Sequence, residues 1–329
     1  MTSIFPPKLK KGDLIGVIAP ARSATILDLE LINRAKKNIE KFGLKVKLFN
    51  NIYGSHFLDS AKIINRVNDI NNAFSDTNIK GIITLIGGYN TIQLLNNIDY
   101  NNIKKNPKIF CGYSDVTTLS TAIYSQTGLV SYSGPHFSTW AIPYELNYMT
   151  DSFKNCCLSS PAYKISTSIK WYDGRWYDKK NKINTQDNKG PIVLFPGSNT
   201  GNLIGGHLRS LNSLQGTQFL PDLSGSVLFL EEDEEVFPAL FLRELTSLSM
   251  QKGFNKIKGI LIGRFQKKSQ MDKEIIKSII TDILPNKIPV IMDLDFGHTM
   301  PICTLPIGGK VEIIADKKSQ ECSIKIIKH

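Results

Sequence analysis

Residues 108–118 have the sequence KIFCGYSDVTT, and this stretch carries the strongest indication of the fold. The apolar run that ends at Cys111 is typical of a buried strand, Gly112 permits a tight turn, and a helix is expected from about Asp115. Residues 81–88, GIITLIGG, repeat the pattern of a buried strand that runs into glycines. Strands of this kind that alternate with helices predict βαβ units and a parallel sheet.

The same alternation extends through the first half of the chain. Further strands are predicted over 13–19, 46–49 and 128–132, and helices over 32–42, 63–74 and 90–97. Because strands covered by helices on both faces are apolar throughout, we expect an α/β fold with a Rossmann-like or flavodoxin-like parallel-sheet domain over residues 1–160. In such folds ligands bind at the carboxyl ends of the strands.

The alternation lapses over residues 161–190, which are polar and aromatic. Four aromatic residues fall close together there, namely Trp171, Tyr172, Trp176 and Tyr177. A connecting loop of this length usually covers a site or links domains. Beyond it, residues 191–329 contain more short strands, with a glycine-containing turn region expected up to Gly206, and predict a smaller, mixed α+β C-terminal domain.

Composition and charge exclude several classes of protein. The 329 residues include 40 basic and 29 acidic side chains, a net charge of +11, but the lysines are scattered and arginines are few. Nucleic-acid binding is therefore not favoured. No apolar run approaches the ~20 residues that span a bilayer, and the N-terminus does not resemble a signal peptide. Five cysteines without a CxxC pair indicate a reducing compartment. We expect a cytoplasmic protein with no membrane or nucleic-acid partner.

Ser114 has two interpretations. On a sharp turn between a strand and a helix its hydroxyl would be exposed beside the free amide of Asp115, as in a nucleophile elbow. The match to G-x-S-x-G is incomplete, because Val116 replaces the second glycine. Alternatively, Ser114 or Asp115 caps the helix, which is the commoner role of serine at this position. This stretch alone leaves both roles open.

A serine nucleophile needs a base, which is usually a histidine. Of the five histidines, His298 is the best placed, since it follows an apolar strand over 289–292 and stands next to a glycine. His207 follows two glycines and would line a site or begin a helix, and His136 is equally open.

The carboxylate that would orient this base is sought in the acidic run 231–235. Glu231 directly ends the apolar strand over 227–230, where a carboxylate can be half buried and hold an imidazole. The other four acidic residues are expected to be solvated. Ser114, Glu231 and His298 thus form one constellation among several that the residues allow.

Other chemistries find no support in the sequence. There is no GxxxxGK[ST] loop, the glycines do not fit GxGxxG, and no HExxH, paired CxxC or clustered His/Asp set has metal-ligand spacing. We expect no metal and no cofactor.

Taken together, seven segments resemble the LD-carboxypeptidase family of serine peptidases, which includes the microcin C self-immunity proteins. Each segment alone is weak evidence for the family, but the occurrence of all seven in this order along nearly the whole chain is specific for it. They are GDLIGVIAPA (12–21), IGGYN (86–90), GYSDVT (112–117), GGHL (205–208), LFLEE (228–232), GILIGRF (259–265) and FGHT (296–299).

This resemblance implies a Ser-Glu-His triad of Ser114, Glu231 and His298. It also implies an oxyanion hole from main-chain amides at Asp115 and at a glycine of the 87–88 pair. We assign Gly88 to the oxyanion hole and Gly87 to substrate binding. In the family the serine lies in the N-terminal domain and its partners in the C-terminal domain, commonly in a homodimer.

The resemblance also bears on the substrate. The segment from Trp171 to Tyr177 resembles a loop that, in the microcin-immunity branch, stacks a tryptophan on an adenine, and Trp171 and Trp176 are the candidates here. The alternative is a hydrophobic lid or interface patch. His207, where relatives often carry Asn, is a further candidate to contact substrate.

Two substrate classes follow. The favoured substrate is an aminoacyl-nucleotide conjugate, whose hydrolysis gives antibiotic immunity. The alternative is a murein tetrapeptide that loses its terminal D-alanine, as in peptidoglycan recycling. A third, different reading is a basic, non-catalytic binding protein in which Ser114 is only a cap.

Overall fold

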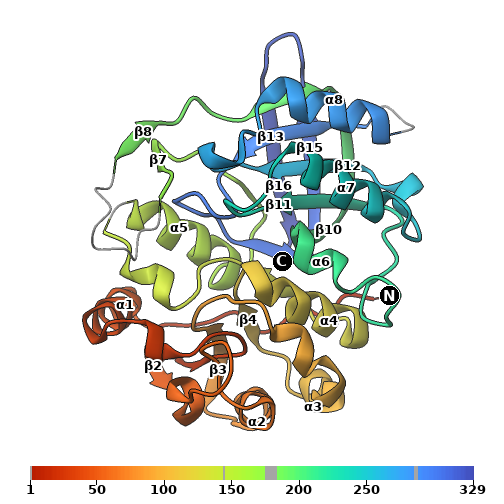
Figure 1. The fold of residues 1–329 in the computed structure, drawn as a ribbon. Coiled ribbons are helices and arrows are strands. Elements are labelled where there is room, and N and C mark those ends of the chain that lie inside the picture. The colour runs from red at the N-terminus through yellow and green to blue at the C-terminus, as the bar shows by residue number, and fades with distance from the viewer. Residues whose placement is uncertain (1, 144, 175–183, 285–287) are drawn as a thin grey trace.

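The computed structural model describes residues 2–143, 145–174, 184–284 and 288–329, which form two stacked lobes (Figure 1). The N-terminal lobe, red to yellow in Figure 1, is built on a six-stranded sheet. Its first five strands are β1 (Leu14–Ile18), β2 (Lys45–Leu48), β3 (Ile79–Thr84), β4 (Ile109–Cys111) and β5 (Ser131–Ser133). Its helices are α1 (Leu29–Lys41), α2 (Ile63–Ser75), α3 (Tyr100–Lys105), α4 (Thr117–Thr127) and α5 (Leu146–Cys157).

The strand order of this sheet is β2-β1-β3-β4-β5, and all four pairings are parallel. This is the flavodoxin-like order of a doubly wound α/β fold. The α/β class predicted from the sequence is therefore confirmed. The sixth strand, β14 (Leu305–Ile307), comes from the far end of the chain and pairs antiparallel with β5.

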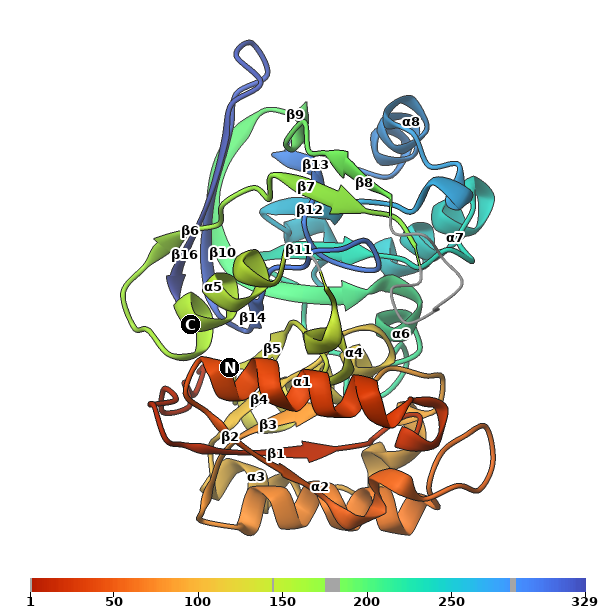
Figure 2. The same cartoon turned by 90° about the vertical axis from the view of Figure 1, so that its left-hand side faces the viewer.

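Helices cover both faces of the N-terminal sheet, with α1 on one side and α2 and α3 on the other (Figure 2). Neighbouring residues of one strand point to opposite faces, so Ile82 packs in the core with α2 and α4, whereas Ile83 packs in the core with α1. Phe110 and Cys111 divide between the two cores in the same way. Because both faces of the central strands β3 and β4 are buried, these strands carry apolar residues toward either side, which explains their largely apolar sequences.

The C-terminal lobe contains an eight-stranded sheet in the order β6-β16-β15-β10-β11-β12-β13-β9. Its strands are β6 (Tyr163–Lys164), β9 (Ile192–Phe195), β10 (Gly197–His207), β11 (Ser226–Glu231), β12 (Gly259–Gly263), β13 (Val290–Leu294), β15 (Lys310–Ala315) and β16 (Cys322–Lys328). The helices are α6 (Leu208–Asn212), α7 (Pro238–Ser249) and α8 (Lys273–Ile283). Strands β10 to β13 are parallel, and the outer pairings are antiparallel. No helix within the described ranges is both long enough and apolar enough to cross a membrane.

The structure differs from the sequence prediction over residues 197–207. The predicted turn region is the long strand β10, which pairs with β11 on one side and β15 on the other. Its glycines are present because neighbouring backbone approaches closely: a Cβ at Gly201 would lie 2.6 Å from the carbonyl oxygen of Gly225. Glycine in a strand interior often marks such a close approach. Because turns are also rich in glycine, the sequence alone does not distinguish the two.

Replacement of Gly205 by alanine is expected to destabilise the C-terminal lobe by more than about 2 kcal/mol. Gly205 has φ +147°, and a Cβ there would lie 1.8 Å from the main-chain oxygen of Phe229, its partner on β11. Urea denaturation measures the loss. The matched control is Gly216→Ala, because Gly216 has φ +75° with nothing within 4 Å of the added Cβ, so only about 1 kcal/mol of backbone strain is expected. Equal losses for the two variants would contradict the steric argument.

Two further elements join the lobes. Strand β14 follows the last parallel strand of the C-terminal sheet in the chain and then lies in the N-terminal sheet, a crossing for which the sequence shows no signal. The hairpin of β7 (Lys170–Tyr172) and β8 (Thr185–Asp187) forms a small separate sheet. Tyr172 exchanges two main-chain hydrogen bonds with Met300, of 2.6 and 3.0 Å, which ties this hairpin to the segment after His298.

Candidate active site

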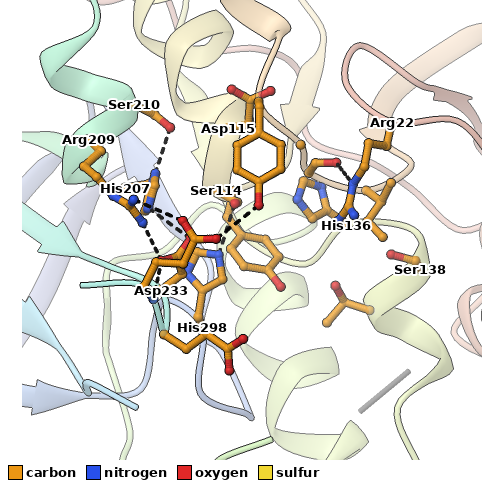
Figure 3. Close-up of a pocket in the computed structure, with 18 of the residues that line it drawn as sticks. Arg22, Ser114, Asp115, His136, Ser138, His207, Arg209, Ser210, Asp233 and His298 are labelled. Atoms are coloured by element: carbon orange, nitrogen blue, oxygen red, sulfur yellow. Dashed lines mark hydrogen bonds and ion pairs between the residues drawn. The ribbon is translucent and has the colours of Figure 1, made fainter. Parts of the chain in front are cut away.

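A cavity of about 310 Å³ lies where the carboxyl ends of the parallel strands of both sheets meet (Figure 3). Such strand ends are where ligands bind in open α/β sheets. The lining residues used below are Arg22 after β1, Gly87 and Gly88 after β3, Ser114 and Asp115 after β4, His136 and Ser138 after β5, His207 at the end of β10, Asp233 after β11 and His298 after β13. The polar side chains of the cavity thus come from at least six different strand ends.

Ser114 lies on a strained turn between β4 and α4. Its φ of +60° is unusual for a residue other than glycine, and strain of this kind often marks functional turns. Gly112 permits the turn, since a Cβ there would lie 2.1 Å from Thr84 Oγ1. No side-chain hydrogen bond caps α4 or the single 3-10 turn at Ser114–Val116 that precedes it. Capping therefore does not explain the position of the serine hydroxyl.

The structure brings Ser114, His298 and Glu231 together in one hydrogen-bonded chain. Ser114 Oγ lies 3.0 Å from His298 Nε2, and His298 Nδ1 lies 2.7 Å from Glu231 Oε2. Glu231 is 3% exposed at the end of β11, as its position after an apolar strand suggests. Gly297 has φ +102°, and a Cβ there would lie 2.8 Å from Glu231 Oε2, so glycine is needed beside the histidine. This geometry suits a nucleophile, a base and an orienting carboxylate.

Gly87, Gly88 and Asp115 line the same cavity as Ser114. A Cβ at Gly87 would lie 3.1 Å from Ser114 Oγ. The Asp115 carboxylate accepts hydrogen bonds from the amide and hydroxyl of Thr91, at 3.0 and 2.6 Å, and so anchors the turn. Within the described part of the chain, neither the Gly88 amide nor the Asp115 amide donates to a protein acceptor. Both amides are available to a ligand.

His207 lies beside the three bonded residues and is fully enclosed. Its ring centroid is 5.4 Å from that of His298, Nδ1 is 2.8 Å from Ser210 Oγ, and Nε2 forms a 3.1 Å ion pair with Glu232 Oε2. Burial opposes protonation of His207, but the carboxylate of Glu232 outweighs it and raises the pKa of the imidazole to about 9. His207 is therefore a cation at neutral pH.

His207 predicts a pH dependence of stability. Its folded pKa of about 9 lies above the ordinary 6.5, so its contribution is complete below pH 6.5 and disappears as the pH rises through 9. The free energy of unfolding of the wild type, relative to His207→Gln, is expected to fall by up to about 3 kcal/mol across this window. Chemical denaturation at several pH values measures it. The control is His56→Gln, at an exposed histidine, and parallel pH curves for wild type and His207→Gln would contradict the prediction.

Of the four acidic residues predicted to be solvated, Glu232 is buried instead. Glu232 is 1% exposed, and Arg209 Nε lies 2.8 Å from its Oε2. Arg209 also pairs with Asp233 and with Glu235. Although burial raises the pKa of Glu232, His207 and Arg209 outweigh that effect and hold it below its ordinary value. No local sequence pattern predicts this network, because its partners are distant along the chain.

One group of described residues has the composition of a metal site. Ligand atoms of His207, Glu232 and Asp233 all lie within 4.8 Å of one another. The guanidinium of Arg209 contacts both carboxylates, and the protonated imidazole of His207 adds a second positive charge. The carboxylates therefore already have cationic partners, and these take the place that a metal ion would fill.

Trp171, the aromatic candidate within the described residues, lies apart from the serine. Trp171 does not line the cavity around Ser114; the Arg264 guanidinium lies 5.0 Å and the Lys267 ammonium 5.7 Å from the centre of its ring. Arg264 is itself fixed by a 2.6 Å ion pair with Asp295. Trp176 lies outside the described residues. Base stacking by either tryptophan remains a prediction.

Arg22 and His136 are cavity residues for which the sequence pattern predicts no definite role. Arg22 follows β1 in the same way that Ser114 follows β4, and its place at a strand end is the only sequence signal. His136, whose role the sequence left open, is 2% exposed and lines the cavity after β5. Burial is the main cause that lowers its pKa, to about 3, with a smaller electrostatic contribution from neighbours that include Arg22, so this imidazole is neutral.

Comparison with known families now identifies the class of protein. The LD-carboxypeptidase N-terminal domain matches residues 15–134, and the LD-carboxypeptidase C-terminal domain matches residues 200–313. The chain belongs to the LD-carboxypeptidase family of serine-type peptidases, and the resemblance stated from the sequence is confirmed.

Individual relatives align over almost the whole chain. A putative carboxypeptidase, YocD of Bacillus subtilis, is 42% identical over 313 residues, 95% of this chain and 96% of the relative. A probable murein peptide carboxypeptidase of Bacillus subtilis is 31% identical over 95% of this chain and 92% of its own length. The microcin C7 self-immunity protein MccF of Escherichia coli is 30% identical over 94% of this chain and 93% of its own.

Solved structures share the whole architecture. An MccF-like protein from Bacillus anthracis has a TM-score of 0.95 and 41% identity, covering 99% of this chain and 100% of that one. MccF in complex with aspartyl sulfamoyl adenosine has a TM-score of 0.88 and 27% identity, and the match covers 99% of each chain.

Proposed function

We propose that this protein is a serine carboxypeptidase or amidase that works through Ser114, His298 and Glu231. The observation that carries the proposal is the unbroken chain of contacts from Ser114 Oγ through His298 to Glu231, at 3.0 and 2.7 Å, inside a cavity between the two lobes. Membership of a family of serine-type peptidases supports it.

The proposed mechanism forms and then hydrolyses an acyl-enzyme. His298 Nε2 accepts the proton of Ser114 as Oγ attacks the substrate carbonyl carbon, while Glu231 accepts a hydrogen bond from Nδ1–H and stabilises the imidazolium. The amides of Gly88 and Asp115 donate to the developing oxyanion, and each such donor contributes about 3 kcal/mol to the transition state. His298 then protonates the leaving nitrogen, and water, activated by the same base, releases the acyl group.

For the substrate we favour an aminoacyl-nucleotide conjugate of the microcin-immunity type. The high structural similarity to an MccF-like protein, and the similarity to MccF with an aminoacyl sulfamoyl nucleoside bound, support this choice. In this reading the bond broken joins the aminoacyl carbonyl to the nitrogen of a phosphoramidate or sulfamate. The aromatic segment that begins at Trp171 would contact the base.

A murein peptide is the second candidate, because a probable murein peptide carboxypeptidase is 31% identical over 95% of the chain. The bond broken would then precede a terminal D-alanine. The same three residues would act, and only the group that leaves would differ.

The two candidates are separated by their products. Purified protein is incubated with aspartyl sulfamoyl adenosine and with a murein tetrapeptide, and the products are followed by mass spectrometry. We expect release of aspartate from the first substrate, with the larger kcat/KM. Preferential release of D-alanine would favour the murein peptide as the substrate. If neither substrate were cleaved, the result would contradict the proposal that the protein is a hydrolase.

The location and assembly of the protein remain predictions. We propose a cytoplasmic homodimer that takes a small peptide or aminoacyl-nucleotide substrate and needs no cofactor. Analytical ultracentrifugation tests the dimer, and a monomer at micromolar concentration would contradict it.

A further inference from the structure

The cavity has a second polar wall that the proposed mechanism does not use. Figure 3 shows His207, Arg209 and Asp233 on one side of Ser114, and Arg22, His136 and Ser138 on the other. On the first side the charged groups pair with one another. The question is what the residues of the other side bind.

His136 presents an unsatisfied ring nitrogen to the cavity. The residue is 2% exposed, its Nδ1 lies 2.7 Å from Thr84 Oγ1, and its Nε2 has no hydrogen-bond partner among the described residues. The point where a Cβ at Gly87 would sit is 3.5 Å from this Nε2 and 3.1 Å from Ser114 Oγ, so both atoms face the same space. A buried polar atom without a partner calls for an explanation, and a ligand in that space is one.

Arg22 and Ser138 add further donors to this wall. Arg22 Nε donates to the carbonyl of Gly87 at 3.2 Å, which fixes the side chain, and within the described part of the chain its two terminal nitrogens have no acceptor. Ser138 is 2% exposed, and its hydroxyl also has no hydrogen-bond partner among the described residues. Its amide donates to Leu85 at 3.0 Å, so the residue is held against the end of β3.

The chemistry of these three groups matches an anion. A guanidinium fork binds carboxylate, sulfonyl or phosphoryl oxygens through two parallel hydrogen bonds, and a serine hydroxyl adds a third donor. Thr84 Oγ1 lies 2.7 Å from His136 Nδ1 and 3.3 Å from the carbonyl oxygen of Cys111. When its proton follows the shorter contact to Nδ1, Nε2 carries the ring proton and becomes a fourth donor. A cation next to unpaired neutral donors is an arrangement that selects charged oxygens over neutral groups.

We propose that Arg22, His136 and Ser138 form a subsite for an anionic oxygen group attached to the scissile nitrogen of the substrate. The inference rests on the proposed function, because it takes Ser114 as the attacking residue. A peptide that ends in a free carboxylate carries such a group two bonds from the scissile nitrogen, and an acyl sulfamate or phosphoramidate carries it one bond away. The subsite therefore explains how one site could accept either class, through the anion that their leaving groups share.

The subsite can be tested by measuring ligand binding to a variant that cannot cleave the ligand. In the Ser114→Ala background, calorimetry compares a peptide ending in D-alanine with its C-terminal carboxamide. A second arm compares aspartyl sulfamoyl adenosine with an analogue in which methylene replaces the sulfonyl group. The arm with the larger difference identifies which source of the anion the subsite favours.

Arg22→Met is expected to weaken binding of the anionic member of a pair about 30-fold or more and of the neutral member less than about 3-fold. Ser138→Ala and His136→Gln should weaken anion binding by smaller factors in the same direction. Arg243→Met, at an arginine whose side chain is 76% exposed on α7, is the matched control and should change neither.

The outcomes separate the subsite from the catalytic proposal. Equal weakening of charged and neutral ligands by Arg22→Met, or no binding of any ligand, would overturn the subsite. Charge-selective binding that depends on Arg22, together with wild-type protein that cleaves none of the ligands, would support the subsite and contradict the hydrolase. Circular dichroism of each variant verifies that it is folded, and Ser138→Ala, the smallest change, serves if Arg22→Met does not fold.

Discussion

Ser114→Ala is expected to reduce kcat/KM by about 10³-fold or more, whichever substrate class proves correct. The reason is that the substitution removes the attacking oxygen and leaves the base and the oxyanion donors in place. Alanine should tolerate the φ of +60° about as well as serine does, and the hydroxyl contacts His298, not the core. The fold should therefore persist, with a free energy of unfolding within about 1 kcal/mol of wild type.

Steady-state kinetics with mass-spectrometric product detection measures the effect of Ser114→Ala. The control is Ser75→Ala, at an exposed serine on α2 whose hydroxyl donates to Asn71 of the same helix. Retention of more than about a tenth of wild-type activity would reject Ser114 as the nucleophile and favour a protein that binds its ligand without cleaving it.

Glu231→Gln is expected to lower kcat by about 10³–10⁴-fold with little change in KM. The carboxylate accepts a hydrogen bond from His298 Nδ1–H at 2.7 Å, which keeps Nε2 free to accept the serine proton. The amide of glutamine can donate instead, so it favours the tautomer with the proton on Nε2, and that tautomer cannot act as the base.

The proton NMR signal of His298 Nδ1–H gives a readout that a merely structural role of Glu231 would not change. This signal should be shifted far downfield in wild type and should be lost in Glu231→Gln. Glu40→Gln, on the surface of α1 in a 4.0 Å contact with Lys36, is the matched control for the change of charge. Loss of less than about tenfold in kcat would argue that another group orients the imidazole.

Much of the N-terminal lobe could be predicted because its strands are buried on both faces. The run 81–86, which includes Ile82 and Ile83, is apolar except for Thr84, and the glycines that follow it mark the carboxyl end of the strand. The same logic, in which a polar residue directly ends an apolar strand, points to Glu231. In both cases one local sequence pattern predicts the strand and also the residues at its carboxyl end, where the site lies.

The remaining features depend on partners that are distant in the sequence. β10 resembles a turn because Gly201 and Gly205 are explained only by the close approach of main-chain atoms at β11, which is distant in the sequence. The burial of Glu232 follows from pairing with Arg209 and His207, which no local pattern shows. Arg22 gains its place in the cavity only because β1 lies next to β3, a pairing that the order of strands along the chain does not reveal.

Strand β14 has a consequence for how such proteins can be recombined. Residues 305–307 pair with β5, so the edge of the N-terminal sheet is completed by chain from beyond the C-terminal sheet. A chimera joined to a relative within residues 161–190 would exchange this strand along with the C-terminal lobe, and the new strand would have to fit the old edge. A fragment that stops before the crossover would leave β5 open to pairing with other molecules. The two lobes thus cannot be exchanged between relatives as independent units. Substrate specificity is more easily transferred by grafting the loops at the strand ends.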